Sequence, residues 1–227
     1  MNTLRFLFAI TTLTLASCIG DDILVDFVEP QIRLAALPTS IAAGDTYQVD
    51  ATFLNNVGQP ESRELGYSSS DPSVFSITDT GLLTANGRGT AQITVSTEYE
   101  GALLQEIGNI TVAEETVQPP ANTSRIGSIR TTSSYALTGE FEITETDGGI
   151  SIAIADDYVA SRALPGLYIY LTNNRNTNVG ALEIGKVQVY EGAHAYDVAG
   201  VSLDEYSHIL YFCKPFGVKV GDGAIEQ

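Results

Sequence analysis

Strict alternation of apolar and polar residues marks several segments of this chain. From Tyr47 to Phe53 the odd-numbered positions are apolar and the even-numbered ones polar, and Ala91 to Val95 repeats the pattern. Successive side chains of a strand point to opposite faces, so this alternation predicts strands with one face buried. Turn-forming pairs such as Gly44-Asp45 and Asn86-Gly87 separate the runs. Because no helical period follows residue 17, the sequence predicts an all-β fold of the β-sandwich type.

The alternation stops between residues 114 and 124 and resumes further on. This stretch contains Pro119-Pro120, which cannot donate hydrogen bonds to a sheet, and few groups that could be buried. In the later run 167–171 the aliphatic residues face one side and the tyrosines the other. We therefore expect two tandem β-sandwich domains, residues 31–113 and 125–227, joined by a linker over residues 114–124.

The beginning of the chain has the features of an export signal. Arg5 precedes an apolar stretch from Phe6 to Leu15 that is too short to span a bilayer. It ends in Leu15-Ala16-Ser17-Cys18, which resembles the lipobox of bacterial lipoproteins. The resemblance implies a signal peptide over residues 1–17, a lipid on the Cys18 thiol and a tether over residues 18–30. The alternative is an ordinary signal peptide that a chance cysteine follows.

An acidic pair, Asp21-Asp22, stands close behind Cys18. It resembles the signal that exports lipoproteins of Bacteroidetes to the outer face of the outer membrane. The alternative is a solvated tether, in which acidic residues are common. We expect a protein that is lipid-anchored to the outer membrane and displayed at the cell surface.

The charge balance excludes one class of partner. The chain contains 28 acidic and 11 basic residues, for a formal net charge of −17. Such a surface repels phosphate backbones, and no cluster of Lys or Arg reverses the charge locally. The sequence therefore predicts no binding of nucleic acid.

Four stretches of the first predicted domain resemble the bacterial Ig-like domain of group two, which occurs in intimin- and invasin-type surface proteins. They are the Gly44-Asp45-Thr46 turn and residues 67–74, 81–85 and 87–95. The family usually has Trp where this chain has Tyr67, and a small residue where it has Phe75. We expect Gly81, Gly87 and Gly89 to supply positive φ angles in tight connections. The resemblance implies a spacer or a part of an adhesin.

The second predicted domain contains four stretches that resemble the DM-thirteen domain. They are residues 135–139, 164–173, 192–196 and 211–221, of which the last contains Cys213-Lys214-Pro215-Phe216. The family generally has Trp where this chain has Phe212, and often an acid where it has Gly166. The resemblance implies electron transfer, with Cys213 as a redox group or as a ligand of a metal or haem.

The residues themselves leave the role of Cys213 open. With Cys18 acylated, Cys213 is the only remaining thiol, so no intramolecular disulfide can form. Strict alternation places it on one face with Ile209 and Tyr211, which also fits a small core residue. His194 and His208 complete the set of soft ligands, but no close metal-ligand spacing is present. A Cys-x-x-Cys-His motif is missing, which excludes covalently attached haem; a bound haem or metal remains open.

The second predicted domain is also rich in tyrosine, which could stack on sugars or pack against a sheet. The tyrosines in question are Tyr168, Tyr170, Tyr190, Tyr196, Tyr206 and Tyr211. No enzyme motif is present, so we expect a non-catalytic surface lipoprotein whose Ig-like spacer presents a DM-thirteen binding domain. Its partners would be the membrane, through the lipid, and an extracellular protein or glycan. The alternatives are a redox module that uses Cys213 and an adhesin or glycan-binding protein.

Overall fold

The structure, a computed structural model, describes residues 26–119 and 123–226. In these ranges the only helix is a short 3-10 helix, η1 (Lys214–Phe216), and all other regular elements are strands. The chain is therefore all-β, as its alternating pattern predicts. No helix in these ranges is long and apolar enough to cross a membrane. Cys18 and Asp21-Asp22 lie outside the described residues.

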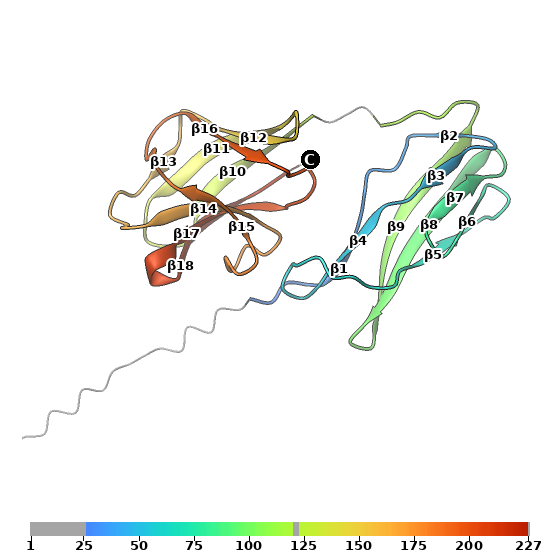
Figure 1. Ribbon diagram of the computed structural model, residues 1–227, viewed down its shortest axis with the longest axis horizontal. Coiled ribbons are helices and arrows are strands. Elements are labelled where there is room, and N and C mark those ends of the chain that lie inside the picture. The colour runs from blue at the N-terminus through green and yellow to red at the C-terminus, as the bar shows by residue number, and fades with distance from the viewer. Residues whose placement is uncertain (1–25, 120–122, 227) are drawn as a thin grey trace, which may run out of the picture.

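The strands before residue 114 form three sheets, which we call the first lobe (Figure 1). One sheet pairs β1 with β4, the second has the order β2-β9-β8-β5 and the third the order β3-β7-β6. Their apolar faces enclose one core cluster. The strands are β1 (Gln31–Leu34), β2 (Ile41–Ala42), β3 (Thr46–Gln48), β4 (Ala51–Leu54), β5 (Gly66–Ser69), β6 (Phe75–Ile77), β7 (Leu82–Ala85), β8 (Gly89–Tyr99) and β9 (Ala102–Ala113).

The alternating run 47–53 forms two strands of different sheets. β3 pairs with β7, whereas β4 pairs with β1, and the chain crosses between the sheets at Val49 and Asp50. Val49 and Phe53 are nevertheless both buried in the core of the lobe. The alternation thus predicts which side chains are buried, although it does not reveal the change of sheet.

The glycines of the first lobe differ in their roles. Gly81 and Gly89 have φ angles of 79° and 151°, as expected. The expectation for Gly87 is wrong, because its φ is not positive. Its Cβ would instead lie 2.9 Å from the carbonyl oxygen of Ser73, so glycine permits a close approach of two backbones at this position.

The strands after residue 123 form a single nine-stranded sheet, which we call the second lobe (Figure 1). Its order is β15-β14-β17-β18-β10-β11-β12-β16, with β13 beside β11. The strands are β10 (Ser124–Thr131), β11 (Leu137–Thr146), β12 (Gly149–Ile154), β13 (Val159–Ala160), β14 (Leu167–Thr172), β15 (Leu182–Lys186), β16 (His194–Ala199), β17 (His208–Cys213) and β18 (Val218–Ala224).

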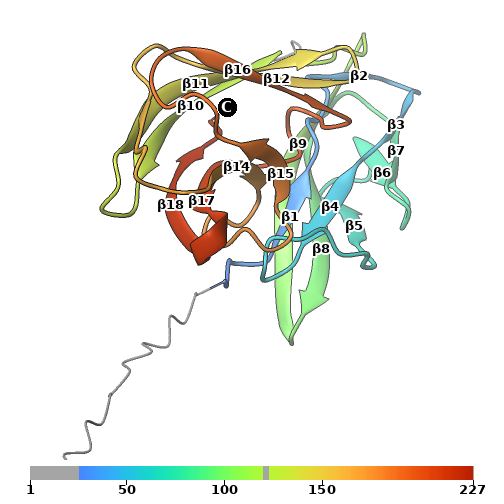
Figure 2. The same cartoon turned by 60° about the vertical axis from the view of Figure 1, so that its left-hand side comes forward.

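This sheet folds over on itself. β10 and β18 pair at Arg130 and Thr131, and one further bridge joins Ile126 to Glu226. Figure 2 shows the two resulting layers, one with β10, β11, β12 and β16, the other with β14, β15, β17 and β18. The main apolar core of the lobe lies between them.

Strand β14 has the two faces that its sequence predicts. Leu167, Ile169 and Leu171 enter the main core, while Tyr170 packs on the opposite face in a smaller cluster with Leu210 and Phe212. All six tyrosines named above are buried or half-buried. They therefore pack at least partly against the lobe, and none of the six is fully exposed.

The first part of the predicted linker contacts the first lobe. Ser40 and Val117 exchange backbone hydrogen bonds of 3.2 and 2.9 Å, and the Ser40 hydroxyl donates to the carbonyl of Glu115. The Thr116 hydroxyl also lies 2.8 Å from a carboxylate oxygen of Asp45. Residues 115–117 thus extend the first lobe beyond β9.

Candidate functional site

Cys213 lies at the end of β17 and is 0 % exposed. Its thiol faces the main core together with Ile209 and Tyr211, as the alternation predicts. The neighbouring Lys214 points outward, where its Nζ pairs with Glu183 at 2.7 Å and lies over the ring of Tyr168. This position makes Cys213 a small apolar side chain of the core.

The two histidines are not brought together with Cys213. His194 begins β16, and its Nδ1 lies 2.9 Å from the carbonyl oxygen of Gly192. His208 begins β17, on the face opposite the thiol, and its Nδ1 lies 2.9 Å from the Ser207 hydroxyl. Residues 26–119 and 123–226 contain no group of three or more His, Cys, Asp or Glu that could hold a metal. Within these ranges, His194 and His208 thus form no three-ligand metal cluster with Cys213.

His208 has a perturbed ionisation of its own. Burial lowers the pKa of His208, and the positive charges of Arg175 and Lys219 act in the same direction, whereas the carboxylate of Asp222 opposes them. Lys219 and Asp222 form an ion pair beside it. The imidazole of His208 is therefore neutral in the folded protein at neutral pH.

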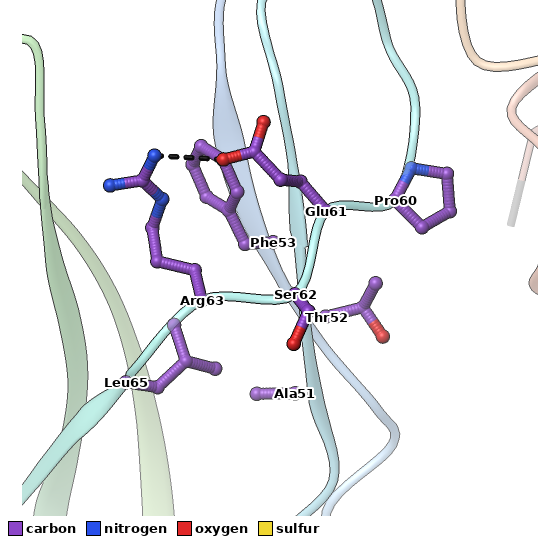
Figure 3. Close-up of a pocket in the computed structure, with 8 residues that line it drawn as sticks. All are labelled: Ala51, Thr52, Phe53, Pro60, Glu61, Ser62, Arg63 and Leu65. Atoms are coloured by element: carbon purple, nitrogen blue, oxygen red, sulfur yellow. Dashed lines mark hydrogen bonds and ion pairs between the residues drawn. The ribbon is translucent and has the colours of Figure 1, made fainter.

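A pocket of the first lobe lies between β4 and the segment that follows it (Figure 3). Arg63 pairs with Glu61 at 2.8 Å and donates to the carbonyl of Glu98 at 2.8 Å. Its guanidinium also lies 5.0 Å from the ring centroids of both Phe53 and Tyr99. Because these contacts already engage the guanidinium, Arg63 stabilises the wall of the pocket. It is therefore poorly placed to bind a ligand there.

The two lobes are joined by the side chain of Arg33, which projects from β1. Its Nη1 donates to the carbonyl oxygens of Asp204 and Glu205 at 3.0 and 2.8 Å, and its Nη2 donates to Oδ1 of Asn173 at 2.8 Å. Asn173 in turn donates to the carbonyl of Glu205 at 3.1 Å. Partial burial lowers the pKa of Arg33, although the nearby carboxylate of Asp204 opposes this effect. One guanidinium thus makes three hydrogen bonds to the other lobe.

Asn174 continues this contact between the lobes. Its side-chain amide is buried and donates to the carbonyls of Asp26 and Val57. Gly58 packs so closely that an added Cβ would lie 2.9 Å from the carbonyl carbon of Asn173. The first described residues of the chain therefore touch both lobes. We call the contacts of Arg33, Asn173, Asn174 and Gly58 the junction.

Sequence reasoning does not find the junction. Arg33 sits in an ordinary alternating strand, and only contacts far along the chain reveal its role. A weak signal exists in Thr172-Asn173-Asn174, because two amides that directly follow a buried strand need partners. Nothing in the sequence indicates that those partners lie in the other half of the chain.

A scan against models of known protein families finds no match for this chain, and a search of curated proteins finds none either. The resemblances to the lipobox, the Ig-like domain and the DM-thirteen domain therefore remain predictions.

Proposed function

We propose that this protein is a non-catalytic, lipid-anchored protein of the bacterial cell envelope. In this proposal an Ig-like first lobe presents a DM-thirteen-like second lobe to an extracellular protein or glycan. The observation that carries it is the junction, in which Arg33 makes three hydrogen bonds to the second lobe. A spacer is useful when it fixes the orientation of what it presents, and a forked guanidinium is suited to that task.

The path of the tether supports the same proposal. The carbonyls of Asp26 and Phe27 accept hydrogen bonds from Asn174 and Asn176 of the second lobe. The next residue, Val28, donates to the carbonyl of Asn56 in the first lobe at 2.9 Å. The described end of the tether, from Asp26 to Val28, therefore lies at the junction and contacts both lobes.

The position of Cys213 favours binding over redox chemistry. A redox thiol needs access to its partner and surroundings that stabilise the thiolate. The thiol of Cys213 is instead fully buried among apolar side chains. We therefore assign Cys213 a role in packing.

The experiment that tests the anchor replaces Cys18 in the full-length protein. Cys18→Ala should abolish the incorporation of labelled fatty acid and move the protein out of the detergent phase. Cys213→Ala is the matched control, and it should keep both properties. A Cys18→Ala protein that still partitions with detergent contradicts the anchor. Surface display is tested by replacing Asp21 and Asp22 with Ala, which should protect the protein from protease added to whole cells.

A second candidate, adhesion to a neutral glycan, is favoured by the outer face of the β8–β9 hairpin. Four successive cross-strand pairs on this face contain no charged side chain, although the chain carries 28 acids. The pairs are Thr90 with Thr111, Gln92 with Asn109, Thr94 with Ile107 and Ser96 with Gln105. Hydroxyl and amide side chains can both donate to and accept from sugar hydroxyls. We call these eight residues the neutral face.

Introducing negative charge on the neutral face tests this candidate. Gln92→Glu combined with Asn109→Asp adds two charges with little change of shape, and Gln118→Glu is a control outside the face. On an array of neutral glycans, the double variant should lose at least tenfold in any binding that the parent protein shows. Unchanged binding by the double variant would assign the glycan site to another surface.

A further inference from the structure

Four ring side chains of the second lobe carry buried polar atoms that lack a well-formed hydrogen bond within the described residues. Tyr158 lies in the turn between β12 and β13, His194 and Tyr196 in β16, and Tyr211 in β17. The three hydroxyl oxygens and Nε2 of His194 are buried and have no hydrogen bond of good geometry within the described residues, although the hydroxyls of Tyr158 and Tyr211 lie near enough to interact with each other. We call these residues the tyrosine–histidine cluster. It spans both layers of the lobe, because β16 and β17 belong to opposite layers (Figure 2).

The rings of the cluster are packed in fixed positions. The centroid of Tyr158 lies 4.8 Å from that of His194 and 6.1 Å from that of Tyr211, and His194 lies 5.3 Å from Tyr196. The N–H of Gly192 donates to the carbonyl of Tyr158 at 3.0 Å, while the carbonyl of Gly192 faces Nδ1 of His194. One short turn therefore sets the positions of Tyr158 and His194 together.

The protonation of the cluster follows from its surroundings. A carbonyl oxygen only accepts hydrogen bonds, so Nδ1 of His194 carries a proton toward Gly192, and in the tautomer that this selects Nε2 is an acceptor. Burial raises the pKa of Tyr196 to about 12, and it also raises the pKa values of Tyr158 and Tyr211. The three hydroxyls thus stay protonated at neutral pH. The cluster offers three O–H donors and one bare nitrogen acceptor.

The large majority of buried side-chain polar atoms in folded proteins have a hydrogen-bond partner, which is either protein or ordered water. We propose that the tyrosine–histidine cluster is a buried binding site for an ordered water molecule that links the two layers of the lobe. Water accepts two hydrogen bonds and donates two, so it can receive from tyrosine hydroxyls and donate to Nε2 of His194. An ion fits less well, because an anion would be buried without a countercharge and a metal would require the phenols to ionise.

This site is tested by whether removing a tyrosine hydroxyl of the cluster lowers or raises the stability of the protein. Removing a buried hydroxyl that has a partner destabilises a protein, whereas removing one without a partner leaves stability equal or higher. We expect Tyr196→Phe and Tyr211→Phe each to lower the equilibrium constant for folding about tenfold in urea titrations, and Tyr196 is the more telling of the two because no other side chain pairs with its hydroxyl. Tyr135→Phe, at an exposed hydroxyl of the same lobe, is the control and should change it little. An unchanged or increased folding constant in both buried variants would overturn the proposal.

Two further measurements separate water from other occupants. The double variant with Tyr196→Phe and Tyr211→Phe should lose less free energy of unfolding than the two single variants lose in sum, because both hydroxyls share one partner. A crystal structure at high resolution should show water density within hydrogen-bond distance of at least three of the four atoms. A visible absorption band and a higher Tm after addition of ferric ion would instead identify a metal site and overturn the proposal. The proposal would also be overturned if the losses in free energy of unfolding were additive and the electron density showed no water at the site.

Discussion

The guanidinium of Arg33 donates a hydrogen bond of 2.8 Å to Oδ1 of Asn173, which lies 140 positions further along the chain. Asn173 is itself held by the carbonyl of Glu205, a carbonyl that also accepts from Arg33. The three residues therefore form a closed set of hydrogen bonds between the first and the second lobe. This contact has consequences for stability and for the orientation of the lobes.

Replacing Arg33 should uncouple the unfolding of the two lobes. Arg33→Ala removes three hydrogen bonds from a charged donor, and we expect it to cost about 1–2 kcal/mol because the site is only partly buried. Arg33→Lys should recover little, because an ammonium cannot reproduce the forked geometry. Calorimetry should show the unfolding transitions of the variant further apart than those of the parent. Arg88→Ala, which removes an exposed ion pair with Glu114, is the control, and an equal effect there would contradict the prediction.

Fragments of the chain should differ in stability according to where they end. A first-lobe fragment of residues 26–118 keeps the backbone pairing of Ser40 with Val117, whereas one of residues 26–113 loses it and is otherwise the same. We expect both to fold with β-type circular dichroism, and the longer fragment to need a higher urea concentration for unfolding. Equal midpoints would show that residues 115–117 contribute nothing. A fragment of residues 123–227 should also fold alone, since the second lobe has its own core.

Cys213 should behave as a core residue. Cys213→Ala should cost about 1 kcal/mol for a small cavity, while Cys213→Ser should cost more because a buried hydroxyl without a partner is unfavourable. The thiol of the folded protein should react with iodoacetamide only at the rate of unfolding. Rapid alkylation under native conditions would contradict the packing role and favour redox chemistry.

Acid should destabilise the protein through His208. The pKa of His208 is lowered in the folded state from an ordinary value of 6.5, so the unfolded chain binds more protons in the interval between the two values. Stability from this group is complete above pH 6.5 and falls as the pH decreases toward the folded pKa. The free energy of unfolding of His208→Gln should therefore fall less between pH 7.5 and pH 5 than that of the parent. Equal decreases would show that His208 ionises alike in both states.

The sequence predicts much of the fold because burial follows the period of a strand. Val49, Phe53, Ile169 and Cys213 face the core as their alternation indicates. The change of sheet at Asp50 is hidden, because a strand that crosses between two sheets keeps its alternation. The junction is also hidden, since the value of Arg33 depends on carbonyls of residues 204 and 205 that no local pattern connects to it. The tyrosine–histidine cluster stays undetected because buried tyrosines and exposed ones look alike in sequence.

The most direct test of a fixed orientation is the distance between two spin labels, one in each lobe. The labels are attached at Thr90→Cys and Asp147→Cys, both exposed, in a chain that begins after Cys18 and carries Cys213→Ala. We predict that pulsed electron paramagnetic resonance gives a single narrow distribution of the distance between the labels. The distribution should broaden when Arg33→Ala is added. A broad distribution in the protein with an intact junction, unchanged by Arg33→Ala, would contradict the account.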